Sequence, residues 1–173
     1  RESTSDFISF CLDPEKASNV TIQPITRFGF DAAIIFSDIL MVPWALERNV
    51  RFKPNHGPML DPLDDAALLD EALLDDVAQK LAPVADAIGR TRSLLREDTA
   101  LIGFAGAPWT VLTYMLEGGS SKDFNISRQM LWNDPAGFDK IMQIVTQATI
   151  EFLSLQAQAG ADALMLFDSW ASA

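Results

Sequence analysis

The sequence has very little cysteine and histidine, and it contains no long apolar run. Cys11 is the one cysteine among 173 residues, which excludes an internal disulfide framework and a zinc site built on cysteines, and which favours a reducing compartment. No apolar run approaches the roughly 20 residues needed to cross a bilayer, and the first residues lack the apolar core of a secretory signal. We therefore expect a cytoplasmic protein without a membrane partner.

Positive charge is also scarce, because 13 Lys and Arg residues face 24 Asp and Glu residues and give a formal net charge of −11. General nucleic-acid binding needs a basic face, so the composition predicts no nucleic-acid partner. The composition still allows an anionic small-molecule ligand, provided that local cationic groups bind it against the negative electrostatic field of the whole protein.

The acidic residues concentrate between Asp61 and Arg90, where eight acidic and two basic side chains occur. Apolar residues recur at helical spacing through the same segment, which indicates an amphipathic helical region with an acidic outer face, broken before Pro83. A solvated face is the first interpretation, and a partner-binding surface is the alternative.

Two stretches 131 positions apart, at 29–38 and 160–169, read almost alike. Each begins with a glycine suited to the end of a helix and continues with a short apolar run without alternation. Such runs are typical of strands buried on both faces in parallel sheets. Each run ends in polar side chains, Ser37-Asp38 and Asp168-Ser169, where α/β proteins place their active sites.

Further signals complete a βα pattern. Asp13-Pro14 and Asp134-Pro135 are expected helix starts, the second opening a helix of roughly 25 residues, and Pro24 is expected to kink or split the first helical stretch. A third buried strand begins at Ala100, and residues 51–58 read as a turn or small hairpin.

The fold class predicted from this order is α/β, a (β/α)8 barrel of the TIM type. Only three strands, near 30–37, 99–105 and 161–168, are predicted, whereas a complete barrel takes about 250 residues. We therefore expect residues 1–173 to be one partial barrel domain, about the first half of a larger one.

Asp38 is the leading candidate for chemistry, because a carboxylate after a buried run is costly to desolvate unless it has a purpose. The structural alternative is an Asp that caps the next helix, and the pattern alone favours it. Tyr114 offers a phenol that donates to a substrate or to Asp38, or that simply packs locally. No nucleophile elbow surrounds Ser169, and the single histidine, His56, is expected in a surface turn without a partner.

Two long motifs carry a family resemblance: residues 30–40, and residues 102–119 with Pro108-Trp109-Thr110, Tyr114 and Glu117-Gly118-Gly119. Together with Phe167-Asp168-Ser169-Trp170 they resemble the uroporphyrinogen decarboxylase family, from about Phe7 to Ala171. This likeness reverses the preference for the structural interpretations of Asp38 and Tyr114.

The resemblance implies a cofactor-free and metal-free barrel, usually a homodimer, which decarboxylates the four acetate side chains of uroporphyrinogen to give coproporphyrinogen. Asp38 then stabilises the cation of a pyrrole protonated on carbon, with Tyr114 beside it. Ser169 matches a substrate contact, Ile34 and Phe104 match apolar positions against the macrocycle, and Phe7 is placed among the substrate-binding residues.

The chain departs from the family pattern at both ends. The family's arginine-rich opening is absent, and its functional histidine would follow Ala173; His56 does not match it. One alternative is a corrinoid-linked methyltransferase of the related barrel family, which holds zinc in later strands. The other is a tetrapyrrole-binding fragment without catalysis.

Overall fold

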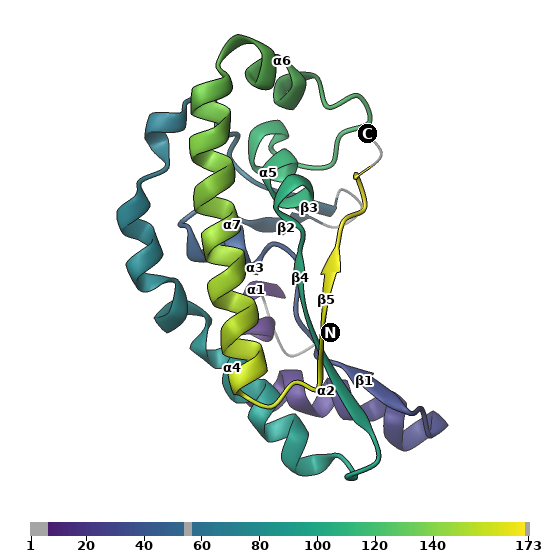
Figure 1. Ribbon diagram of the computed structural model, residues 1–173. Coiled ribbons are helices and arrows are strands. Elements are labelled where there is room, and N and C mark those ends of the chain that lie inside the picture. The colour runs from purple at the N-terminus through teal and green to yellow at the C-terminus, as the bar shows by residue number, and fades with distance from the viewer. Residues whose placement is uncertain (1–6, 54–56, 172–173) are drawn as a thin grey trace.

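The chain folds around three parallel strands that follow one another along the sequence with helices between them (Figure 1). This computed structural model describes residues 7–53 and 57–171. The α/β class with a parallel sheet is confirmed. In spatial order the strands are β1 (Ala32–Ile34), β4 (Ala100–Gly106) and β5 (Ala163–Phe167).

The remaining elements lie before and between these strands. Ahead of β1 are α1 (Phe7–Cys11) and α2 (Pro14–Phe28). Between β1 and β4 are α3 (Met41–Ala45), the antiparallel pair β2 (Arg51–Lys53) and β3 (Gly57–Met59), 3-10 turns at Ala66–Leu68 and Glu71–Asp76, and α4 (Val77–Leu94). Between β4 and β5 are α5 (Pro108–Glu117), α6 (Asn125–Asn133) and α7 (Pro135–Gln158). The predicted turn position of His56 falls outside the described residues.

Both Asp-Pro pairs begin helices, as the sequence predicts. Asp13 Oδ1 accepts a hydrogen bond from the backbone N–H of Lys16 at 3.0 Å, and Asp134 Oδ1 accepts one from the N–H of Gly137 at 3.0 Å. At the other end of α2, Gly29 adopts a left-handed conformation with φ 67°. A residue with a Cβ is strained there, so glycine suits this helix end.

Neither internal proline divides its helix. Helix α2 continues through Pro24, and α4 continues through Pro83, so the predicted break before Pro83 is wrong. A proline removes one backbone hydrogen bond. The turns beside both prolines bury Thr21, Val84 and Ile88, and this tertiary packing holds the helix across the missing bond.

Helices cover one face of the sheet. Helices α2 and α4 pack their small and branched side chains against it, and α7 runs along β4 and β5 (Figure 1). The buried cluster between α2, α4 and the sheet contains Ala17, Ala33, Ile35, Ala87, Ile88 and Leu101, and it extends to Phe104 of β4. This layer is typical of the outer shell of a βα-repeat fold.

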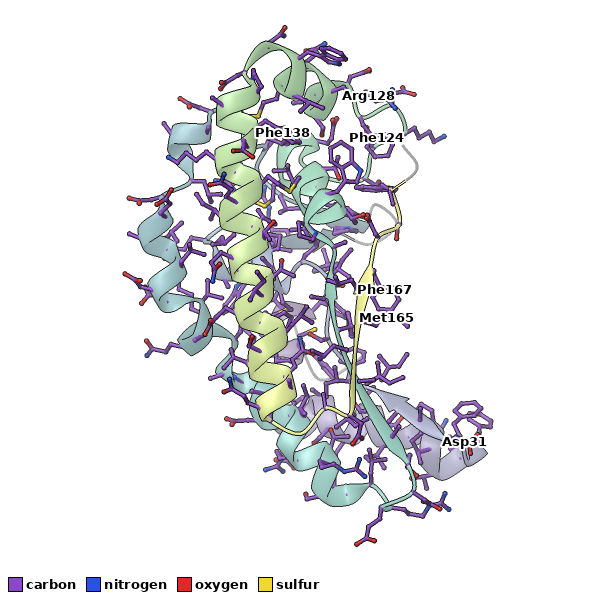
Figure 2. The ribbon with its side chains drawn as sticks, viewed as in Figure 1. Asp31, Phe124, Arg128, Phe138, Met165 and Phe167 are labelled. Atoms are coloured by element: carbon purple, nitrogen blue, oxygen red, sulfur yellow. The ribbon has the colours of Figure 1, made fainter. Side chains whose placement is uncertain are left out.

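On the opposite face of the sheet, side chains of paired positions lie next to one another. Ile34 lies opposite Ile102, and Phe104 lies opposite Met165, so these residues share one face with Phe167. Figure 2 shows Met165 and Phe167 pointing away from α7. Ile34 is 48% exposed and Met165 41% exposed, so the described residues leave these parts of the face open, while Phe104 between them is buried.

Strand β1 is shorter than the predicted range of 30–37 because it separates from β4. The last bond between them runs from the N–H of Ile35 to the carbonyl of Ile102. Beyond it, the buried side chain of Gln156 on α7 replaces the strand: its Oε1 accepts from the N–H of Phe104, and its Nε2 donates to the carbonyl of Phe104, both at 2.8 Å. The backbone of β4 stays satisfied, and residues 36–38 are released from the sheet.

Charged and polar side chains interrupt the apolar stripes of the helices described above. Of the helices in residues 7–53 and 57–171, none is long and apolar enough to span a bilayer.

Candidate active site

Asp38 lies in a tight turn between β1 and α3. Its Oδ1 accepts a hydrogen bond from the N–H of Leu40 at 2.8 Å. Leu40 is the N-cap of α3 and makes no side-chain cap bond, so Asp38 closes a turn ahead of the helix and is not the N-cap itself. Burial raises the pKa of the Asp38 carboxyl, and the Leu40 N–H opposes that rise.

Gly106 at the end of β4 gives this turn its room. A Cβ at Gly106 would lie 2.6 Å from Cγ2 of Val111 and 2.9 Å from Cβ of Ile39. Real Cβ atoms do not approach neighbours this closely, so a side chain here would displace the turn. The glycine therefore allows the Asp38 turn to pack directly on the end of β4.

Tyr114 extends from α5, the helix that follows β4, and is half-buried. Burial raises the pKa of its phenol, and the negative charge of Asp38 raises it further. The phenol therefore releases its proton less readily than a free tyrosine does. One face of the Tyr114 ring stacks on Trp170, with ring centroids 4.5 Å apart and planes inclined by 28°.

Ser169 follows β5 and is exposed, between Asp168 and Trp170. Asp38, Tyr114 and Ser169 thus come from segments after β1, β4 and β5, which are parallel. The carboxyl ends of parallel strands meet at one edge of a sheet, which is where barrel enzymes bind substrates.

The predicted apolar contacts lie in different surroundings. Ile34 is 48% exposed, whereas Phe104 is 7% exposed and packs edge-on against Phe167 at 5.2 Å. Phe7 on α1 packs against Phe52 at 4.6 Å and against Phe36 at 5.9 Å, and Phe36 lies two residues before Asp38.

The sequence alone predicts no role for two residues of the site, Thr110 and Trp170. Thr110 lies four positions before Tyr114 on α5, so the two share a helix face. Its hydroxyl donates to Asp168 Oδ1 at 2.7 Å. The four-residue spacing was readable from the sequence, but the contact with the segment after β5 was not.

A metal would need a cluster of ligands at the site. Within the part of the chain that the structure describes, no group of three or more His, Cys, Asp or Glu residues is arranged to hold a metal ion. The polar groups on these segments are two carboxylates, Asp38 and Asp168, one phenol and the hydroxyls of Thr110 and Ser169, which suit hydrogen bonding and charge stabilisation.

Comparison with known proteins relates this arrangement to a family. A family model described as uroporphyrinogen decarboxylase (URO-D) matches residues 1–173. The chain belongs to the uroporphyrinogen decarboxylase family. Proteins named uroporphyrinogen decarboxylase from Rhodospirillum rubrum and Campylobacter concisus are 46% and 47% identical to it, over 99% and 100% of this chain.

The chain spans about half the length of these curated relatives, 49% and 51% respectively. A solved structure of a methyltransferase from Methanosarcina mazei also resembles it, with a TM-score of 0.74 over 92% of this chain and 47% of that chain. At 16% identity this likeness shows the fold alone. The described strands and helices are thus about half of a larger (β/α)8 barrel fold, as the sequence predicts.

Proposed function

We propose that the full-length protein removes CO2 from the four acetate side chains of uroporphyrinogen and so produces coproporphyrinogen. The observation that carries this proposal is the placement of a half-buried carboxylate, Asp38, and a half-buried phenol, Tyr114, on segments that follow neighbouring parallel strands, in a chain that matches the family over its whole length. No organic cofactor or metal is part of the proposal.

Each decarboxylation exchanges one carboxylate for one proton. The pyrrole is first protonated on a ring carbon, which makes the ring a cationic electron sink. The bond between the side-chain methylene and the carboxylate then breaks, CO2 leaves, and the electron pair flows into the ring. A proton added to the methylene carbon forms the methyl group, and the ring carbon returns its own proton, so the net reaction consumes one proton.

Asp38 stabilises the cationic ring in this scheme. Its Oδ1 is occupied by the Leu40 N–H, which leaves Oδ2 for the pyrrole N–H groups. The turn fixes the carboxylate before the cation forms, and partial burial strengthens the attraction between the two charges. Binding is therefore stronger in the cationic transition state than in the ground state, which is the requirement for catalysis.

Tyr114 acts as a hydrogen-bond donor beside Asp38. Because burial and the Asp38 charge both raise the pKa of the phenol, it stays protonated at neutral pH. We assign Ser169 to a polar contact with the substrate. Ile34 and Phe104, with Phe7 behind the Asp38 turn, are assigned to the apolar surface that faces the macrocycle.

The direct test is an anaerobic assay of the full-length protein with uroporphyrinogen, with products separated by the number of carboxylates. We expect stepwise loss of four carboxylates, unchanged after treatment with a chelator. Activity lost to the chelator and restored by zinc would instead favour a methyltransferase-type metal site. Binding of the tetrapyrrole without turnover would favour the non-catalytic alternative.

The resemblance also implies a homodimer for the full-length protein, which we carry forward as part of the proposal. Sedimentation equilibrium at several protein concentrations measures the mass directly. A monomer at all concentrations contradicts this part without affecting the proposed reaction.

A further inference from the structure

The hydroxyl of Thr110 joins two segments that are about 60 residues apart in the sequence. Thr110 is fully buried at the start of α5. Its Oγ1 donates to Asp168 Oδ1 at 2.7 Å and accepts from the backbone N–H of Trp170 at 3.3 Å. A hydroxyl can donate and accept at once, so this single group holds both ends of the turn after β5.

The turn held in this way carries the ring that covers Tyr114. Trp170 stacks on Tyr114 at 4.5 Å, and its carbonyl accepts a hydrogen bond from Nε1 of Trp109 at 2.9 Å. Phe124 meets the Trp170 ring edge-on, with centroids 5.1 Å apart. The Trp170 side chain is therefore enclosed by residues of α5 and of the segment that enters α6, and it has little freedom to leave the tyrosine.

We propose that Thr110 is a positioning residue, whose hydroxyl fixes the turn after β5 so that Trp170 holds the phenol of Tyr114 beside Asp38. The inference rests on the proposed decarboxylation, because it assigns a role at the same site. Thr110 itself does not contact the reacting groups: it acts through Trp170 and Tyr114. A loosened Tyr114 spends less time aligned with the reacting ring, and misalignment of about 1 Å lowers turnover by up to about 100-fold.

The hydrogen bond from Thr110 also explains the placement of Asp168. The hydroxyl donates to a carboxyl oxygen of Asp168, an acceptor that fixes this side chain against the start of α5. Asp168 is otherwise exposed, with one oxygen committed to the helix. This hydrogen bond therefore orders the turn that also carries the exposed Ser169.

Matched substitutions in the full-length protein separate the hydroxyl from the shape of the side chain. Thr110→Val keeps the shape and removes the hydroxyl, whereas Thr110→Ser keeps the hydroxyl. We expect Thr110→Val to lower kcat about 10-fold with KM within about twofold, and Thr110→Ser to keep kcat within about threefold of wild type. Wild-type kcat in Thr110→Val, or an equal loss in both variants, overturns the proposal.

Changing the exposed partner tests the same bond without altering the buried helix, in case Thr110→Val fails to fold. Asp168→Ala removes the acceptor, and Asp168→Asn keeps a carbonyl oxygen in its place. We expect the alanine variant to show the same loss of kcat as Thr110→Val and the asparagine variant to retain most activity. Equal losses would show that the charge of Asp168 matters in itself, which contradicts the proposal.

A crystal structure of the valine variant examines the geometry independently of activity. We expect the Trp170 ring to leave the face of Tyr114, and a retained stack refutes the positioning role. If wild-type protein does not decarboxylate uroporphyrinogen but the ring moves, the proposed function fails and the positioning role of Thr110 stands. If the wild-type protein is active but the Trp170 ring remains stacked on Tyr114 in the valine variant, the proposed function stands and the positioning role of Thr110 fails.

Discussion

Replacing Asp38 with asparagine separates its charge from its role in the turn. The amide oxygen of asparagine still accepts the Leu40 N–H, so the turn that is closed at 2.8 Å remains. What disappears is the negative charge that we assign to the pyrrole cation. Because one oxygen is already bonded to the backbone, the loss corresponds to one electrostatic stabiliser, about 100- to 1,000-fold in kcat.

The same substitution, which should lower kcat, should maintain or raise the thermal stability of the protein at neutral pH. Burial raises the pKa of Asp38 in the folded protein. The stability that this group contributes is therefore fully present below the pKa of the unfolded chain, and it is lost as pH rises through the higher folded pKa. At pH 7 the folded state holds a poorly solvated charge, so Asp38→Asn should keep or raise Tm. That advantage should shrink as the pH is lowered into the range where wild-type Asp38 is protonated.

An exposed aspartate provides a matched control. Asp65 Oδ1 accepts from the N–H of Ala67 at 2.8 Å, with the same two-residue offset as Asp38 and Leu40, but Asp65 lies on the surface ahead of a 3-10 turn. Asp65→Asn should leave kcat unchanged. Steady-state kinetics and thermal melting of both variants decide the case: a well-folded Asp38→Asn protein with near-wild-type kcat would show that Asp38 only forms the turn.

Two further substitutions test how the fold supports the site. Gly106→Ala places a methyl group within 3 Å of its neighbours and should lower the free energy of unfolding in urea by about 1–3 kcal/mol. We expect kcat to fall more than KM rises. The control is Gly89→Ala in helix α4, where a methyl group has room and should stabilise the protein slightly. Gln156→Leu leaves the backbone N–H and carbonyl of Phe104 without their hydrogen-bond partner and should lower the free energy of unfolding by about 2–6 kcal/mol. The control is Gln143→Leu on the same helix, which loses one exposed hydrogen bond and should change the free energy of unfolding little. A mild effect at Gln156 would mean that water or strand movement satisfies β4 instead.

Local sequence signals predicted the ends of helices at positions where a single residue type determines the backbone conformation. Asp13 and Asp134 begin helices because a carboxylate satisfies the free N–H groups, and Gly29 ends one because it tolerates a positive φ. The prolines show the limit of such signals. Pro83 lies inside α4 because buried neighbours on both sides outweigh the single lost hydrogen bond, and that packing is invisible in a local pattern.

The sequence by itself determined the parallel α/β class, the order of its elements and the two polar strand ends, because uninterrupted apolar runs and caps are local properties of the chain. It also carried the family motifs that single out Asp38 and Tyr114. Only the tertiary structure decided which residues support them. Gln156 replaces a strand partner, Gly106 admits the Asp38 turn, and Thr110 holds Trp170 over Tyr114. These contacts join segments from five to about 70 residues apart, and their distances depend on how the helices pack on the sheet, which no local pattern specifies.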